Sequence, residues 1–184
     1  MLSISFNIRK FLRNAVVFLS TATVNFCIFA KDLHPIQLVD LSGVSNLGGE
    51  YNITGFFMND KYYGTVGRGV GGGGTDCCIG IPKNWRPNMK IVVRWTVSIW
   101  NENLQRNASG TYDFPKLVGV YSASVPVEKY ENPGTLYVHF FPGGKARIVS
   151  SEFGALSPKH PILLNDPRAL LTATQGIKIR EAEK

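Results

Sequence analysis

Polar and apolar residues alternate along most of residues 90–99, KIVVRWTVSI, which is the clearest strand pattern in the chain. The apolar positions are Ile91, Val93, Trp95, Val97 and Ile99, and the polar positions include Lys90, Arg94, Thr96 and Ser98. Successive side chains of a strand point to opposite faces, so this period of two predicts one buried face. We expect Ile91, Val93, Trp95 and Val97 to face the core, and Lys90, Arg94 and Thr96 to lie outside it.

Seven other segments are predicted to be strands, because each is a short run rich in β-branched and aromatic residues between turn residues. They are residues 36–41, 51–58, 61–66, 77–81, 117–122, 136–141 and 145–151. The sequence Pro142-Gly143-Gly144 separates the last two segments and is typical of a hairpin. Residues 67–74 contain six glycines and are predicted to form a glycine-rich loop, because glycine weakens a strand interior.

One short helix is predicted near the end of the chain. Asp166 suits an N-cap and Pro167 the first helical position, so we expect one or two turns over residues 168–174, closed by Gly176. Residues 177–184 are expected to form a frayed tail. Eight strands and one short helix predict an all-β fold, a single-domain β-sandwich or a small open barrel over residues 31–176.

The N-terminus has the features of a targeting segment. Arg9, Lys10 and Arg13 form a positive region, and an apolar run over residues 15–30 follows and ends in Ala30. We predict that residues 1–30 are a signal peptide cleaved after Ala30, which would export the chain to the periplasm. An uncleaved membrane anchor is the alternative, although the run is shorter than the roughly 20 residues that a spanning helix needs.

Composition and charge describe a globular, moderately basic protein. Apolar residues make up 44% and charged residues 18% of the 184 residues, which is unlike a disordered chain. The formal net charge of +7 falls to +4 once the three basic residues of the signal segment are removed. Such a charge is compatible with an acidic partner or an anionic envelope surface. An exported chain without a basic run or a nucleic-acid motif is not expected to bind nucleic acid.

The adjacent cysteines Cys77 and Cys78 are the most specific chemical feature of the sequence. They fit two interpretations: small apolar residues packed beside the glycine-rich loop, or a vicinal disulfide, which an oxidising compartment favours. A metal site would need further ligands at short spacing, and none lies nearby in the sequence. The pair also lacks the C-x-x-C spacing of redox catalysts.

Motifs of catalysis are missing from the sequence. The three histidines, His34, His139 and His160, are interpreted as structural or surface residues. There is no G-x-S-x-G elbow, no H-E-x-x-H helix and no paired-carboxylate motif. The glycine pattern that starts at Gly67 formally matches a dinucleotide fingerprint, but it is not followed by a helical sequence. We therefore predict no catalytic residue, no cofactor and no enzymatic activity.

The motifs resemble a known family. The runs GGGGTDCCIGIPKNWRPNMKIVVRW and VPVEKYENPGTLYVHFFPGGKARIVSSEF, followed by His160-Pro161, are similar to the bacterial family of domains of unknown function numbered 3304. The positions that carry the likeness are Gly71 to Gly74, Cys77, Cys78, Pro82, Trp85, Pro87, Trp95, Tyr130, Pro133, Gly134, Leu136, Val138, His139, Phe140 and Pro142. The chain departs from it at Asn88-Met89, where members often carry Gly-Leu, and in lacking a lipoprotein signal.

The resemblance implies an envelope protein of Gram-negative bacteria. Some members are encoded beside type VI secretion phospholipase effectors, where they look like immunity proteins. It implies no catalytic residue. We therefore expect a periplasmic binding protein that neutralises such an effector by occlusion; the alternative is a structural or assembly factor of the envelope. The expected contact surface joins the glycine-rich loop to the loop around Trp85, with Arg68, Trp85 and Arg86 as contacts, because loops carry recognition and these residue types dominate interface hot spots. Trp85 has a second interpretation, in which it plugs one end of the core.

Overall fold

The alternating segment forms strand β5 (Lys90–Ile99) in the computed structural model of the chain, which describes residues 35–67, 76–99, 116–164 and 166–181. Ile91, Val93, Trp95 and Val97 are buried and Lys90 and Arg94 are exposed, as the pattern predicts. Val92 lies on the outer face and is exposed. Thr96 is half-buried on the outer face. Ser98 is buried, because the pairing with the neighbouring strand shifts register between Val97 and Ser98 and interrupts the alternation there.

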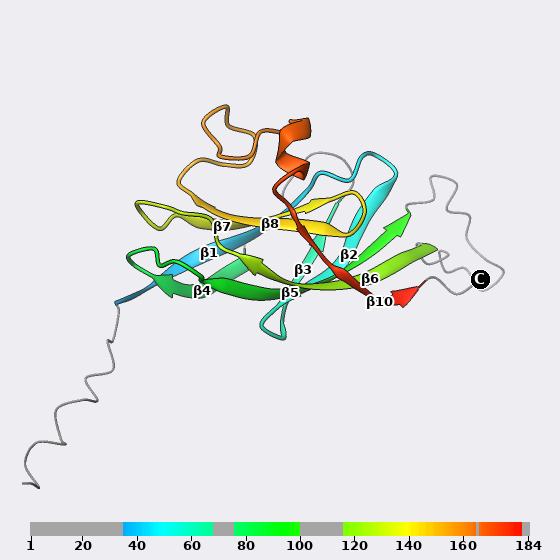
Figure 1. Cartoon of the computed structure of the whole chain (residues 1–184), viewed down its shortest axis with the longest axis horizontal. Coiled ribbons are helices and arrows are strands. Elements are labelled where there is room, and N and C mark those ends of the chain that lie inside the picture. Colours follow the sequence, from blue (N-terminus) through cyan, green and yellow to red (C-terminus); the bar gives the residue numbers. More distant parts are fainter. Residues whose placement is uncertain (1–34, 68–75, 100–115, 165, 182–184) are drawn as a thin grey trace, which may run out of the picture. The chain divides into compact units, whose positions relative to one another are not determined.

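Two five-stranded sheets face each other and form a β-sandwich (Figure 1). The first sheet has the order β4-β1-β7-β8-β9, with bounds Asp76–Pro82, Ile36–Ser45, Thr135–Phe141, Lys145–Ser151 and Thr174–Gln175. The second has the order β10-β6-β5-β2-β3, with bounds Ile177–Glu181, Lys116–Pro126, Lys90–Ile99, Tyr51–Met58 and Lys61–Val66. Neighbouring strands are antiparallel except β1 and β7, which are parallel. The all-β prediction is confirmed, and of its two forms the sandwich is the one observed.

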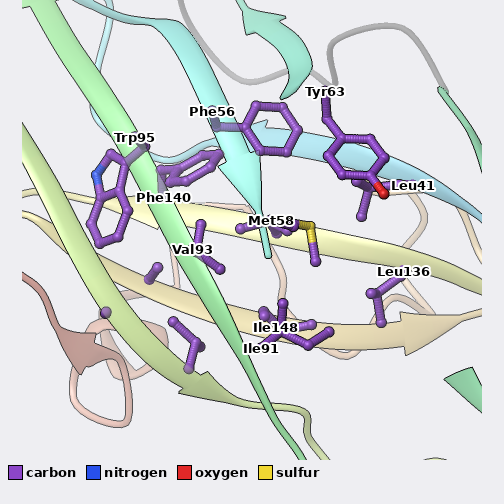
Figure 2. Packing of buried hydrophobic residues seen from close by; sticks show 14 of the residues in the cluster. Leu41, Phe56, Met58, Tyr63, Ile91, Val93, Trp95, Leu136, Phe140 and Ile148 are labelled. Carbon is purple, nitrogen blue, oxygen red and sulfur yellow. The ribbon is translucent and has the colours of Figure 1, made fainter. Parts of the chain in front are cut away.

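The main core lies between the sheets and is centred on aromatic residues (Figure 2). Trp95 on β5 is fully buried, and its ring centroid lies 5.7 Å from that of Phe140 on β7. Phe56 on β2 meets the same Phe140 edge-on, with 5.5 Å between centroids. Aromatic side chains bury large apolar areas, so these contacts across the sandwich join the two sheets.

The strands β7 and β8 of the first sheet are buried on both faces, because a long connection covers their outer side, whereas β4 and the start of β1 are largely exposed. Inner positions of β7, such as Phe140, belong to the main core, whereas Tyr137 and Phe141 point the other way. Residues 152–173 are here called the covering segment. Tyr137 and Phe141 form a second cluster with Ile162 and Ala169 of this segment. Figure 1 shows this segment in orange beside β8. Burial on both faces explains why residues 136–141 are almost continuously apolar.

The end of the chain differs from the predictions in two ways. Asp166 does act as an N-cap, accepting a hydrogen bond from the Arg168 amide, but the helix is a single 3-10 turn, η1 (Pro167–Leu170). It is shorter than expected over residues 168–174 because the chain turns at once into β9, which pairs with β8.

The expected frayed tail is instead the edge strand β10 up to Glu181, paired antiparallel with β6. The charged residues of this stretch gave no strand pattern. Its backbone hydrogen bonds are made to β6, more than fifty residues earlier in the chain. Ladder pairing of this kind does not depend on a strongly apolar sequence.

The described strands belong to one compact unit, His34–Lys184. Within the described residues, no helix has the length and apolar character required to cross a bilayer. The predictions for the signal segment, residues 1–30, fall outside the described residues, as does almost all of the glycine-rich loop. Export of the chain therefore stays a prediction.

Candidate functional site

The loop that carries Trp85, residues 83–89 between β4 and β5, is fastened to the sandwich at several points and is here called the Trp85 loop. The Trp85 indole Nε1–H donates to the Val127 carbonyl oxygen over 2.9 Å. The Val127 amide in turn donates to the Met89 carbonyl oxygen, also over 2.9 Å. At the other end, the Tyr130 hydroxyl donates to the Pro82 carbonyl oxygen over 2.5 Å. These bonds hold both ends and the middle of the loop against residues 127–130.

The segment that receives these bonds is itself tied to the first sheet. Val127 forms a parallel bridge with Ile148 on β8, and the Glu128 amide donates to the Ile148 carbonyl oxygen over 3.0 Å. The Glu128 carboxylate accepts two hydrogen bonds from Arg147, at 2.6 and 2.9 Å. A bidentate pair of this kind fixes both partners, so the Trp85 loop rests on a rigid base.

Trp85 serves mainly as an anchor, and Arg86 is the residue that the loop presents. Trp85 is half-buried and packs against the main core, as the core-plug interpretation requires. Arg86 is exposed. Burial raises the pKa of the Tyr130 phenol, and the nearby Arg86 guanidinium opposes that rise, which places a positive charge close to the buried phenol. Arg68, the third predicted contact, lies outside the described residues.

Three exposed lysines lie near Arg86 in the chain or on the segment to which its loop is bonded: Lys83 and Lys90 at the ends of the Trp85 loop, and Lys129 beside Tyr130. The hydrogen bonds that join Trp85, Met89 and Pro82 to Val127 and Tyr130 hold the loop and the 127–130 segment together. A cluster of like charges raises the local potential and attracts an acidic surface. The exposed charges on and beside the Trp85 loop are mainly cationic, with the exposed Glu131 following Tyr130.

The structure joins Cys77 and Cys78 in a disulfide on β4, an edge strand of the first sheet. Cys77 is exposed and Cys78 half-buried. An oxygen of Asp40, on the neighbouring strand β1, lies within 4.8 Å of both sulfurs. Asp40 lies far from the two cysteines in the chain, so no sequence motif links it to them. A disulfide has no thiolate to offer a metal, so the three residues do not make a metal site in this state.

Two buried histidines face each other on the outer side of the first sheet. His139 on β7 is fully buried and His160 in the covering segment is 3% exposed, with their Nε2 atoms 3.0 Å apart. His139 Nδ1 lies 3.0 Å from Asn46 Oδ1. His160 Nδ1 lies 2.9 Å from the Phe153 carbonyl oxygen. Sequence reasoning missed this pair, because the two residues sit in unrelated segments and form no motif.

Both histidines have lowered pKa values. Burial, followed by the neighbouring His160 and Arg147, lowers the pKa of His139 to about 3. Burial also lowers the pKa of His160, although its hydrogen bond to the Phe153 carbonyl works in the opposite direction. At neutral pH the two rings are therefore uncharged, and Nε2 of each points at the other ring instead of at solvent.

Two pockets lie elsewhere on the domain. One of about 160 Å³ is lined by Asn46, Phe141, Pro142, Asp166, Pro167 and Leu170. The other, about 250 Å³, is lined by Leu47, Tyr51, Val97, Val118, Tyr121, Pro142, Gly143 and Gly144. Neither contains a predicted contact residue. The lining of the second pocket is mostly apolar. The first pocket lies next to the histidine pair, because Asn46 both lines this pocket and contacts His139.

Comparison with known proteins identifies a family but no function. Residues 48–148 match the model of a family described as "Protein of unknown function (DUF3304)". The matched span is more than half of the chain and includes the disulfide, the Trp85 loop and His139, but the whole covering segment, with His160, follows it. No curated protein and no solved structure matches the chain.

Proposed function

We propose that this chain, which belongs to the DUF3304 family, is a periplasmic binding protein that neutralises a secreted phospholipase-type effector by occluding it. The observation that carries the proposal is the construction of the Trp85 loop. Its middle and both ends are hydrogen-bonded to the 127–130 segment, while Arg86 stands exposed. A loop that is already ordered loses little conformational entropy on binding, which favours tight association.

The positive charge of this surface indicates that the partner presents an acidic surface to it. Arg86 and the lysines at 83, 90 and 129 are exposed on and beside the Trp85 loop. Cationic loops of this kind speed encounter with an acidic surface and select against a basic one. Arginine is also over-represented among residues that contribute most of the binding energy. We therefore place the contact on the exposed side of the Trp85 loop, with Trp85 holding the loop from below.

The experiment is a charge reversal with a matched control. Arg86→Glu removes the central cation of the loop, and Lys116→Glu makes the same kind of change at the opposite end of the β5–β6 pair, where Lys116 pairs with Ile99. Both residues are exposed, so both variants are expected to keep the melting temperature of the wild type. Each variant is produced in cells that also make a candidate effector, a phospholipase that a gene adjacent to that of this chain is found to encode, and survival and direct binding to the purified effector are measured.

We expect Arg86→Glu to lose protection and to bind the effector at least about tenfold more weakly, whereas Lys116→Glu protects as the wild type does. Full protection by folded Arg86→Glu would place the contact elsewhere on the domain. Failure of the wild type to bind or protect against the effector would contradict the immunity function itself. That outcome would favour a structural or assembly role in the envelope.

A further inference from the structure

We propose that the His139–His160 pair is a proton-binding site that latches the covering segment, residues 152–173, onto the first sheet. The two rings belong to a chain of four hydrogen-bonding groups that runs from Asn46 through both histidines to the Phe153 carbonyl. One end of this chain has a fixed direction, because a carbonyl oxygen accepts hydrogen bonds and never donates them. His160 must therefore carry a proton on Nδ1 in every protonation state of the pair.

In the neutral pair the remaining directions follow one after another. A neutral imidazole has one donor and one acceptor, so Nε2 of His160 accepts. The facing Nε2 of His139 must then donate across the 3.0 Å separation, which leaves Nδ1 of His139 as an acceptor. Asn46 satisfies that acceptor by turning its amide nitrogen toward the ring, a half-turn about its last torsion. The two histidines are thus opposite tautomers.

One added proton reverses the direction of the chain without breaking it. When His160 is an imidazolium, its Nε2 donates to Nε2 of His139. Nδ1 of His139 then carries the proton of that ring and donates to Asn46 Oδ1, which is the atom placed 3.0 Å away in the structure. Asn46 is half-buried and lines the pocket of about 160 Å³, so its amide lies where the proton can enter.

A second proton has no such solution, because both Nε2 atoms would be donors pointing at each other. The nearby positive charges of Arg147 and Lys159 further disfavour a doubly charged pair. Arg147 on β8 is the cross-strand partner of His139, and its guanidinium is shared with Glu128. On the covering segment, Asp166 lines the Asn46 pocket but is bonded to Arg168, and Lys159 precedes His160 in the chain. On β1, the residue paired with His139 is the apolar Val44.

The second proton can therefore be accommodated only when the rings separate. His160 is the member that can leave, because it sits in a connection without regular ladder pairing, whereas His139 lies within β7 between β1 and β8. Its departure would free residues 153–162 and expose Tyr137, whose ring meets the His160 ring edge-on at 4.8 Å. The Arg147 side chain, which donates to the Ala169 carbonyl oxygen over 3.2 Å, would still hold the far part of the segment.

The tautomers can be observed directly in the wild-type fold. The full chain, labelled with nitrogen-15 and carrying His34→Gln to remove the third histidine, is examined by long-range proton–nitrogen spectra of the imidazole rings. At pH 7.5 we expect His139 to be protonated on Nε2 and His160 on Nδ1. On acidification, the tautomer of His139 should switch to Nδ1–H while His160 becomes charged. Identical tautomers at pH 7.5, or two independent titrations near the ordinary histidine pKa of about 6.5, would overturn the proposal.

A variant tests the role of Asn46. A carboxylate accepts hydrogen bonds only, so Asn46→Asp forces His139 into the Nδ1–H form and requires the added proton. We expect this variant to show one imidazolium at pH 7.5, whereas the same change at Asn59 in the exposed β2–β3 turn leaves the pair neutral. A neutral pair with unchanged tautomers in folded Asn46→Asp would contradict the proposed direction of the chain.

The latch itself is tested by hydrogen exchange, corrected for intrinsic rates. The reporter is the amide of His160, which donates to the Ser157 carbonyl oxygen, and the reference amides are those of β5. Below pH 6.5 the opening constant of the covering segment should rise at least about tenfold per pH unit, because opening takes up a proton. Folded His160→Phe should show no such rise. A wild type without pH-dependent opening, or an equal dependence in His160→Phe, would refute the latch.

Discussion

Truncation of Trp95 should produce the largest single loss of stability in β5. The residue is fully buried, and its ring lies 5.7 Å from Phe140 and 5.7 Å from Tyr121 between centroids. A Cβ built on Gly176 would lie 2.7 Å from the ring, so the link between β9 and β10 closes tightly over it. Trp95→Ala would therefore leave a cavity bordered by both sheets and by the end of the chain. Backbone pairing of the surrounding strands would prevent this cavity from collapsing.

The expected magnitude combines three contributions. Large-to-small truncation of a buried tryptophan costs about 3–5 kcal/mol. That range already includes the loss of the two aromatic contacts, each of which contributes about 0.5–1.5 kcal/mol beyond the burial of apolar area. The indole Nε1 of Trp95 is buried without a hydrogen-bond partner among the described residues, so its removal returns part of a penalty of about 1–3 kcal/mol. We expect a net loss of about 4 kcal/mol for Trp95→Ala.

Equilibrium unfolding in urea, at constant slope against denaturant, measures these losses. Trp95→Phe keeps most of the ring volume and removes the unpaired donor, so it should cost about 1 kcal/mol. Thr96→Ala, one position along on the outer face, should cost under about 1 kcal/mol. Equal losses from Trp95→Ala and Thr96→Ala would show that the assignment of inner and outer faces is wrong.

Three further outcomes are expected. Gly144→Ala should lower stability by about 1–3 kcal/mol in thermal unfolding, because Gly144 has a φ of +72° and an added Cβ would collide with the Tyr121 ring. Trp85→Phe should cost about 1 kcal/mol through the lost hydrogen bond and should speed hydrogen exchange in the Trp85 loop while β7 stays protected. Because burial lowers the pKa of His139 to about 3, the stability that its neutral burial confers should be complete above its unfolded pKa of about 6.5 and should fall as pH drops from there toward 3, by up to about 1.4 kcal/mol per pH unit; a flat profile would contradict neutral burial of the pair.

Much of the fold could be predicted from local pattern. The bounds of β2, β3, β5 and β8 match the predicted segments, because turn residues border each of them and each carries β-branched or aromatic residues. What local pattern could not show was long-range pairing. β10 is a strand because β6 offers it a partner, and residues 136–141 are apolar on both faces because the covering segment lies over them.

The candidate site was predictable only in part, for a related reason. Pro82, Trp85 and Pro87 mark an unusual loop in the sequence, but the hydrogen bond from Trp85 to Val127 spans 42 positions and could not be predicted from local pattern. The histidine pair is less accessible still. A histidine in an apolar strand has no sequence feature that names its partner, and only the folded covering segment brings His160 to His139.

The most direct test of the proposed binding function is a hydrogen-exchange footprint of the chain mixed with a purified phospholipase that a gene adjacent to its own is found to encode. The account predicts slowed exchange in the Trp85 loop and in residues 127–131, with no change near Lys116 at the far end of β6. Slowed exchange confined to the far end of the sandwich, or to the covering segment, would contradict the proposed contact surface, and a wild-type chain that forms no complex with the effector would contradict the function.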